Sequence, residues 1–124
     1  MIITTNSKNN YCESFFTGGD LDAINNLSSK FKSETGGCRA YALLEASLGY
    51  CLSITVREFA QNHNIDLEEV VVKIRLDLSN RANPTVEKDI QLIGNIDDKE
   101  KQKLMKASEA CSIYKSLVNG ISFI

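Results

Sequence analysis

Histidine and paired cysteine motifs, which build most metal sites, are scarce or lacking in this sequence of 124 residues. It has one histidine, His63, and four cysteines, no two of which form a C-x-x-C pair. These numbers give little support to a zinc site. The opening residues lack the basic and apolar stretches of a secretory signal peptide. We therefore expect a cytoplasmic protein without a structural disulfide framework.

The sequence also lacks a strong excess of either charge. It has 14 basic and 16 acidic residues, which gives a net charge of −2 and no indication of a nucleic-acid partner. Hydrophobic residues make up 43% and charged residues 24%, which is typical of a soluble globular protein. The length predicts a single domain, residues 1–124, with one hydrophobic core. We expect no cofactor.

Residues 40–63 predict a long central helix, because they contain no proline and one glycine. At 1.5 Å per residue it would be roughly 36 Å long, so we expect the fold to wrap around it. Charged residues interrupt the stretch, which argues against a membrane span. Apolar residues fall on nearly every side, which is typical of a buried helix; they are Leu43, Leu44, Leu48, Leu52, Ile54, Val56 and Phe59.

The residues before this helix give weaker indications. Residues 1–10 fit a frayed segment or a short edge strand, and residues 11–17 fit a strand that ends at a glycine pair. Residues 20–32 fit either a helix or one or two short strands. Gly36 and Gly37 indicate a loop.

Alternating apolar and polar residues after the helix predict strands at residues 69–78 and 86–93. The loop between them contains the only proline, and we expect an antiparallel hairpin. One side of the second strand consists of Val86, Lys88, Ile90 and Leu92.

Asp97 and Glu100 have the spacing of a capping box at the start of a further helix. Residues 113–118 predict a second short helix or a continuation, and the apolar residues 121–124 predict a final strand that pairs with another, for example across a dimer. The fold class is therefore α+β with mostly antiparallel strands. The predicted inner face of the helix consists of Leu104, Met105, Ala107 and Ser108.

Helix geometry places Cys51 on a stripe of leucines and hydroxyl groups. Tyr41 lies about 80° from Cys51 around the helix, whereas Glu45 and Arg57 lie about 120° away and reach the thiol only through a bend or from another subunit. Such a stripe also fits ordinary helix packing, with hydroxyls bonded to carbonyls one turn back. Residues within about 60° of Cys51 include Leu44, Ser47, Leu48, Thr55 and Glu58.

Each cysteine is, on the residues alone, either an inert small hydrophobe or a redox-active thiol. Cys111 lies at a predicted helix junction, where free amide groups would favour a thiolate. Cys38 is a rival redox thiol, because the adjacent Arg39 would lower its pKa. We interpret Cys12 as inert.

The pattern P-[EY]-x-L-L followed by L-G-x-C-x-x-x-T-x-R is matched at Tyr41, Leu43, Leu44, Leu48, Gly49, Cys51, Thr55 and Arg57. The pattern C-P-V-[HY]-[KR]-[ST]-L is matched at Cys111, Tyr114, Lys115, Ser116 and Leu117, and I-x-L-x-G at Ile90, Leu92 and Gly94. These motifs resemble those of the OsmC/Ohr family, small thiol peroxidases that reduce organic hydroperoxides, and the resemblance covers roughly residues 36–124. Ala40 and Ser112 stand where the family patterns have proline, and no arginine precedes Arg39.

The resemblance implies an intertwined homodimer with active sites at the subunit interface. It implies that Cys51 is the peroxidatic thiol, which becomes a sulfenic acid, and that Cys111 resolves it as a disulfide. The substrate would be an alkyl or lipid hydroperoxide, and the reductant a dithiol or a lipoylated protein. The residues expected to support the pocket are Tyr41, Glu45, Leu48 and Thr55, with Arg39 or Arg57 in place of the family's thiolate-stabilising arginine.

Two alternatives stay open at this point. The same fold could form a non-catalytic dimer that senses redox state or binds a small apolar ligand beside Cys51. It could also be a structural dimer with inert thiols. No nucleic acid or membrane partner is expected in any of the three cases.

Overall fold

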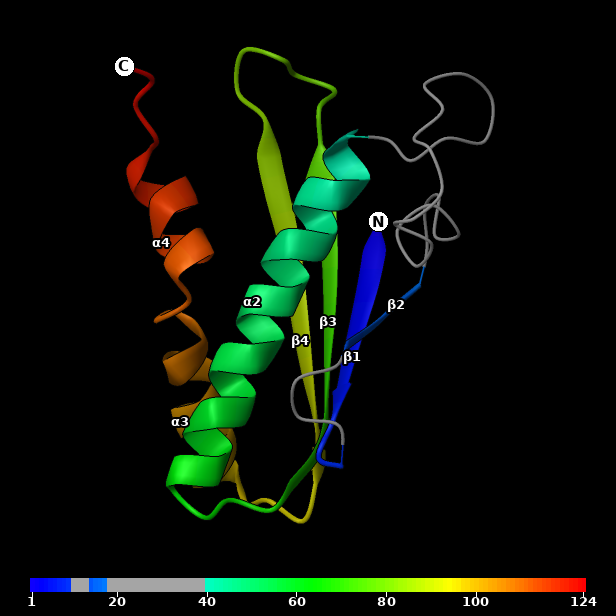
Figure 1. Ribbon diagram of the computed structural model, residues 1–124, viewed down its shortest axis with the longest axis vertical. Helices are drawn as coiled ribbons and strands as arrows, with labels where there is room; N and C mark the ends of the chain where they lie inside the picture. The colour runs from blue at the N-terminus through cyan, green and yellow to red at the C-terminus, as the bar shows by residue number, and fades with distance from the viewer. Residues whose placement is uncertain (10–13, 18–39) are drawn as a thin grey trace.

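The computed structural model describes residues 1–9, 14–17 and 40–124, and the statements below concern these residues. The predicted helix or strands at residues 20–32 and the loop at residues 36–37 lie outside them. Among the described helices, none is long and apolar enough to cross a membrane. The elements, shown in Figure 1, are β1 (Ile2–Ser7), β2 (Ser14–Thr17), α2 (Ala40–Asn62), β3 (Leu67–Asp77), β4 (Thr85–Gly94), α3 (Asp98–Ser108) and α4 (Ser112–Asn119).

The four described strands form one antiparallel sheet in the order β2-β1-β3-β4. The predicted hairpin is confirmed, because β3 and β4 pair along their length, with Ile74 opposite Lys88 and Val72 opposite Ile90. The prediction of a frayed or edge strand at the N-terminus is wrong: β1 lies between β2 and β3. Its alternating burial explains this position, since Ile2, Thr4 and Asn6 face the core despite the polar character of the segment.

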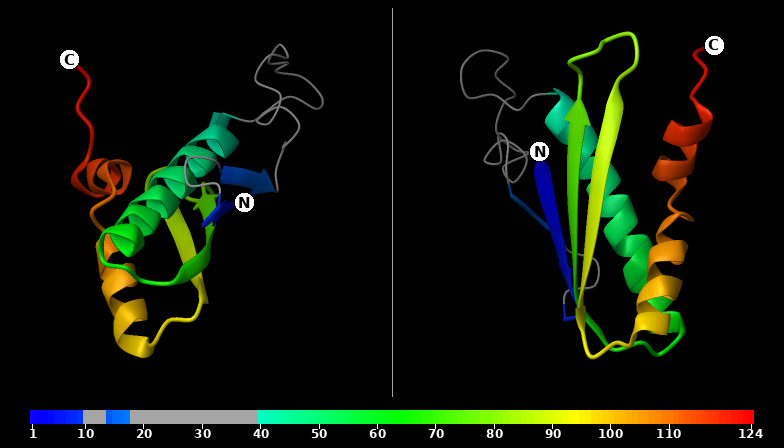
Figure 2. Two further views of the ribbon diagram at one scale, coloured as in Figure 1. Left: turned by 60° about the horizontal axis from the view of Figure 1, so that its bottom comes forward. Right: turned by 180° about the vertical axis from the view of Figure 1, so that it is seen from behind.

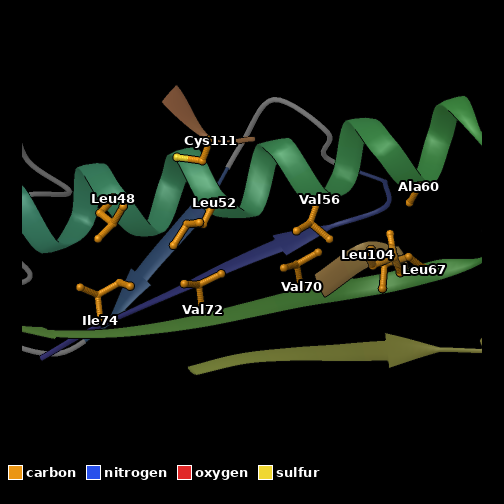
Figure 3. Close-up of a cluster of buried hydrophobic side chains, with 10 residues drawn as sticks. All are labelled: Leu48, Leu52, Val56, Ala60, Leu67, Val70, Val72, Ile74, Leu104 and Cys111. Atoms are coloured by element: carbon orange, nitrogen blue, oxygen red, sulfur yellow. The ribbon is translucent and has the colours of Figure 1, made fainter. Parts of the chain in front are cut away.

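Helix α2 packs across one face of this sheet, and the core lies between them (Figure 3). Leu48, Leu52 and Val56 of the helix lie opposite Val70, Val72 and Ile74 of β3. The buried side of β3 follows the alternation that the sequence predicts, because successive strand residues point to opposite faces. Mixed α+β architecture with antiparallel strands is therefore confirmed.

Two features show how α2 sits on the sheet. Gly49 is where the helix backbone comes closest to β1: a Cβ atom at this position would lie 2.5 Å from Thr4 Oγ1. The expectation of a helix buried on all sides is wrong for the single chain, because the side away from the sheet is partly open. Leu44 and Tyr50 are exposed there, since the described elements cover only part of that side. Tyr41 is exposed at the start of the helix.

The two C-terminal helices flank α2, away from β1 and β2 (Figure 2). Helix α3 begins with the predicted capping box: Glu100 N–H donates to the Asp97 carboxylate, and Asp97 N–H donates to the Glu100 carboxylate. Leu104 and Ser108 form its buried side, but Met105 is 42% exposed, so its predicted inward position is wrong. Met105 follows Leu104 by one residue, which turns it by 100° toward solvent. Helix α4 is separate from α3, which confirms the prediction of a second short helix over that of a continuation.

The chain ends in an exposed apolar tail, residues 121–124, that is not a strand. It projects away from the sheet in both Figure 1 and Figure 2. Gly120, with φ of +88°, ends α4 and directs the chain outward. The predicted final strand is therefore wrong for the single chain, because the tail does not reach either edge of the sheet. Phe123 is 97% exposed.

Candidate active site

Cys51 and Cys111 form a disulfide that joins the middle of α2 to the start of α4. Their Cα atoms are 5.9 Å apart, within the usual range for a disulfide. The two sulfurs differ in access: Cys111 is buried, with 1% of its surface exposed, whereas Cys51 is half-buried. The structure thus brings together the two cysteines of the sequence motifs and leaves one of them reachable from solvent.

The first turn of α4 contacts both sulfurs. Cys111 is the N-cap residue, and its Sγ accepts a hydrogen bond from Tyr114 N–H at 3.4 Å. The first amides of a helix lack acceptors within the helix, so a cap atom takes one of them. Ser112 follows, and its Oγ lies 4.0 Å from Cys51 Sγ. Each sulfur therefore has its own polar neighbour from one helix start.

An open apolar groove lies between α2, α4 and the β3–β4 hairpin; neither cysteine lines it, but Leu48, one turn before Cys51, and Tyr114 of α4 do. It consists of two adjoining hollows, of about 520 Å³ and 350 Å³, that share Pro84, Val86 and Leu117. We call it the α4 groove. Among the described residues, its wall contains two cations, Arg81 and Lys88, and no carboxylate. The remaining lining residues are Tyr41, Leu44, Leu48, Leu76, Leu78, Tyr114 and Val118.

Lys88 is the cation at the end of this groove that contains Leu48 and Tyr114. Its Nζ lies 4.3 Å from the centroid of the Tyr114 ring, a cation–π distance. Sequence reasoning missed this residue. The alternation of β4 nevertheless gave a signal for it, because Lys88 is the one charged residue on the side of the strand that otherwise consists of Val86, Ile90 and Leu92.

Arg57 lies on the opposite side of α2, against the sheet. It is 1% exposed, and its guanidinium donates to Asn6 Oδ1 at 2.8 Å and to the carbonyl oxygens of Asn6, Leu67 and Glu68. Burial lowers the pKa of Arg57, and the Glu68 carboxylate partly opposes this effect. The structure therefore directs this predicted site cation toward β1 and β3 and not toward Cys51.

Glu45 also faces the sheet. One carboxylate oxygen accepts a hydrogen bond from Leu76 N–H at 3.1 Å, and the other lies 3.2 Å from the amino group of Met1. Its side chain is 8% exposed. A buried carboxylate needs such partners, because an unpaired charge in the interior is costly. The structure thus places Glu45 in the contact between α2 and the sheet.

The other predicted site residues have three different positions. Tyr41 and Leu48 line the α4 groove. Thr55 Oγ1 donates to Cys51 C=O at 2.8 Å, the helical back-bond that ordinary packing predicts. Arg39, together with the rival thiol Cys38 and Cys12, lies outside the described residues.

An antiparallel sheet that supports a long helix, with a disulfide at the middle of that helix, defines a class of small α+β dithiol proteins. The profile of the OsmC-like protein family matches residues 33–124, and the chain belongs to this family, as the motifs predict.

The fold resembles the crystal structure of an OsmC-like hydroperoxide resistance protein from Jannaschia sp. CCS1, with a TM-score of 0.56. The two chains are 17% identical, and the alignment covers 98% of this chain and 88% of the other. This likeness concerns the fold. No curated protein matches the chain.

Proposed function

We propose that the protein is a thiol-dependent peroxidase that reduces organic hydroperoxides. The observation that carries the proposal is the disulfide between a half-buried cysteine, Cys51, and a buried one, Cys111, with an apolar groove that includes Leu48, one helical turn from Cys51. A peroxidatic thiol must be reached by its substrate, and a resolving thiol must lie within bonding distance of it. Membership of the OsmC-like family supports the same role.

The reaction proceeds in three steps. The Cys51 thiolate attacks one peroxide oxygen, the O–O bond breaks, and the alkoxide takes a proton to leave as the alcohol, with Cys51 as sulfenic acid. Cys111 then attacks the Cys51 sulfur, water leaves, and the disulfide forms. An external dithiol, such as a small-molecule dithiol or a lipoylated protein, reduces this disulfide and is itself oxidised.

The α4 groove supports an alkyl or lipid hydroperoxide as the substrate. Its wall is largely apolar and extends from Leu48, one turn before Cys51, to Tyr41 at the start of α2. Burial of an alkyl group contributes about 0.8 kcal/mol per CH₂, which favours such a substrate over hydrogen peroxide.

Replacement of each cysteine tests the proposal. We expect Cys51→Ser to abolish turnover of cumene hydroperoxide with a dithiol reductant. Cys111→Ser should leave a sulfenic acid or mixed disulfide on Cys51, detected by intact mass. Cys38→Ser is the matched control and should retain turnover. If Cys51→Ser kept the wild-type rate, or if Cys38→Ser lost it, the assignment would be wrong.

We also propose that two copies of the chain associate. The apolar side chains of the tail are exposed in the single chain, as are Tyr41 and Leu44 of α2, and a patch of this kind is typical of an interaction surface. Light scattering coupled to size exclusion should give twice the mass of 13.8 kDa. A monomer at micromolar concentration would exclude a stable homodimer.

The groove itself favours one alternative, a non-catalytic module that binds a small apolar ligand. Its combined size accommodates such a ligand without any chemistry at Cys51. This alternative predicts no hydroperoxide turnover with any dithiol but a rise in Tm with the ligand. Thiols that resist mild peroxide would instead indicate a structural protein with inert cysteines.

A further inference from the structure

The hydroxyl of Ser112 contacts the sulfur that the proposed reaction uses first. Ser112 Oγ lies 4.0 Å from Cys51 Sγ, a hydrogen-bonding distance for sulfur. The contact joins residues 61 positions apart in the chain, so it depends on the way α4 docks against α2. Ser112 is exposed and Cys51 is half-buried, so the contact lies on the accessible side of the disulfide.

The position of Ser112 in α4 explains why its hydroxyl is available to donate a hydrogen bond to the Cys51 sulfur. Ser112 is the first residue of the helix, and Cys111 already caps it by accepting from Tyr114 N–H. The Ser112 side chain is therefore not needed as a cap. Serine hydroxyls rotate freely and donate one hydrogen bond.

We propose that, in the dithiol state, the Ser112 hydroxyl donates a hydrogen bond to the Cys51 thiolate and makes Ser112 a catalytic residue. This inference rests on the proposed peroxidase function for its consequence, but the hydrogen bond can be measured without any peroxide. Hydrogen bonds to a charged acceptor are stronger than neutral ones, so the contact stabilises the thiolate over the thiol. The two sulfurs then have separate donors: Ser112 O–H for Cys51 and Tyr114 N–H for Cys111.

Other ionisable groups lie on the elements around Cys51, and the nearest is its disulfide partner Cys111, which the test below removes. Glu58 lies two turns further along α2 and is exposed, and α4 contributes Tyr114 and Lys115. Lys88 of β4 lies above the Tyr114 ring. On the other side of α2, the Glu68 carboxylate of β3 acts on Arg57, and the Met1 amino group, just before β1, pairs with Glu45. The ionisable residues of α3 are Asp98, Lys99, Glu100, Lys101, Lys103 and Lys106, on a helix whose buried residues are Leu104 and Ser108. The Ser112 substitutions below leave all these charges unchanged, so a difference among them reports the hydroxyl.

The test uses the full chain with Cys51 as its single cysteine. Cys12 and Cys38 are replaced by serine, and Cys111 by alanine, so that no new hydroxyl lies beside the Cys51 sulfur. The rate of Cys51 alkylation by iodoacetamide is measured from pH 5 to pH 10 in this protein and in its Ser112→Ala, Ser112→Thr and Ser116→Ala derivatives. We expect Ser112→Ala to raise the pKa of the Cys51 thiol by about 1, a tenfold lower thiolate fraction below that pKa. Ser112→Thr should keep the lower pKa because it retains the hydroxyl. Ser116→Ala, one turn along the same helix, is the control.

The rates at the two ends of the pH range carry a signature that altered packing would not produce. Thiolate nucleophilicity increases with thiol pKa, with a Brønsted coefficient of about 0.4–0.5. Ser112→Ala should therefore react about threefold more slowly at low pH and about threefold faster on the high-pH plateau. A rate change of the same sign at all pH values would indicate altered access to Cys51 and would overturn the proposal.

Identical titration curves for Ser112→Ala and the parent would also overturn it. Failure of the hydrogen bond and failure of the peroxidase function can be distinguished. If Cys51→Ser retains full hydroperoxide turnover, the peroxidase assignment fails whatever the titration gives. If only the titrations coincide, the peroxidase assignment stands and Ser112 has no catalytic role.

Discussion

The two sides of α2 use polar residues in opposite ways. On the sheet side, Arg57 and Glu45 are buried and their charged groups are bonded to strand backbone or to the chain's amino group. On the α4 side, Cys51 is half-buried, one turn from Leu48 in the wall of the open groove that also contains Lys88. One helix thus provides the attachment of the core on one side and the reactive group on the other. Arg57 shows that a residue can share a sequence motif with Cys51 and still lie outside the site.

The two sides of α2 also differ in how closely their side chains are packed. The sheet side has the close approach of Gly49 to Thr4 and a continuous set of buried apolar side chains. The groove side leaves Leu117 and Val118 exposed. Substitutions on the sheet side should therefore change stability, and substitutions on the groove side should change reactivity.

Arg57→Met should have the largest effect on stability. It removes the guanidinium and its hydrogen bonds to the side-chain oxygen of Asn6 and to the carbonyls of Leu67 and Glu68, of which the last keeps the Lys8 N–H as a donor. A hydrogen bond to a charged group contributes about 1.5–3 kcal/mol, so we expect a loss of about 3 kcal/mol or more in the free energy of unfolding, measured by urea denaturation.

Arg75→Met is the matched control, since Arg75 is exposed and its Nη1 lies 3.8 Å from a Glu87 carboxylate oxygen. Surface pairs of this kind contribute little, so its effect should stay within about 0.5 kcal/mol. The alkylation rate of Cys51 in the folded, reduced Arg57→Met protein should equal that of the wild type. A clear fall in this rate with unchanged stability would place Arg57 in the site instead and break the comparison.

Local patterns in the sequence predict much of this fold. The Asp97–Glu100 capping box and the alternation in β3 are set by residues within a few positions of one another, and both are present in the structure. The inner position of β1 depends on pairing with β3 about 70 residues later, which no local pattern in residues 2–7 indicates. The prediction of a strand at residues 121–124 was wrong for a similar reason. An apolar run indicates a segment that is stabilised by burial, but it does not show that the single chain contains a strand to pair with it.

The candidate site divides in the same way. The family motifs identified Cys51 and Cys111, and the angular position of Arg57 already set it about 120° from the thiol. The partners of Arg57 on β1 and β3 required the topology of the sheet. The contact of Ser112 with Cys51 required the docking of α4, and in the sequence Ser112 is only a residue that differs from a family pattern.

Lys88→Met should have the smallest effect, and on reactivity only. Lys88 contacts Tyr114, whose N–H donates to the Cys111 sulfur, so its ammonium group lies on the same side of α2 as the disulfide. A cation at a partly exposed site stabilises a nearby anion by about 0.5–1 kcal/mol at high effective dielectric. We expect the second-order rate of the reduced protein with cumene hydroperoxide to fall about two- to fivefold. The wild-type rate should also decrease with added salt, and the rate of Lys88→Met should not.

Lys73→Met makes the same change of charge on the other face of the sheet. Lys73 lies on β3 between the buried residues Val72 and Ile74 and pairs with Asp89, so its side chain points away from α2. Its rate and salt dependence should match those of the wild type. If both lysine variants reacted equally slowly, net charge and not position would account for the effect. If neither variant differed from the wild type, hydrogen bonds alone would stabilise the Cys51 thiolate, and the Ser112 hydroxyl would be the group that sets its reactivity.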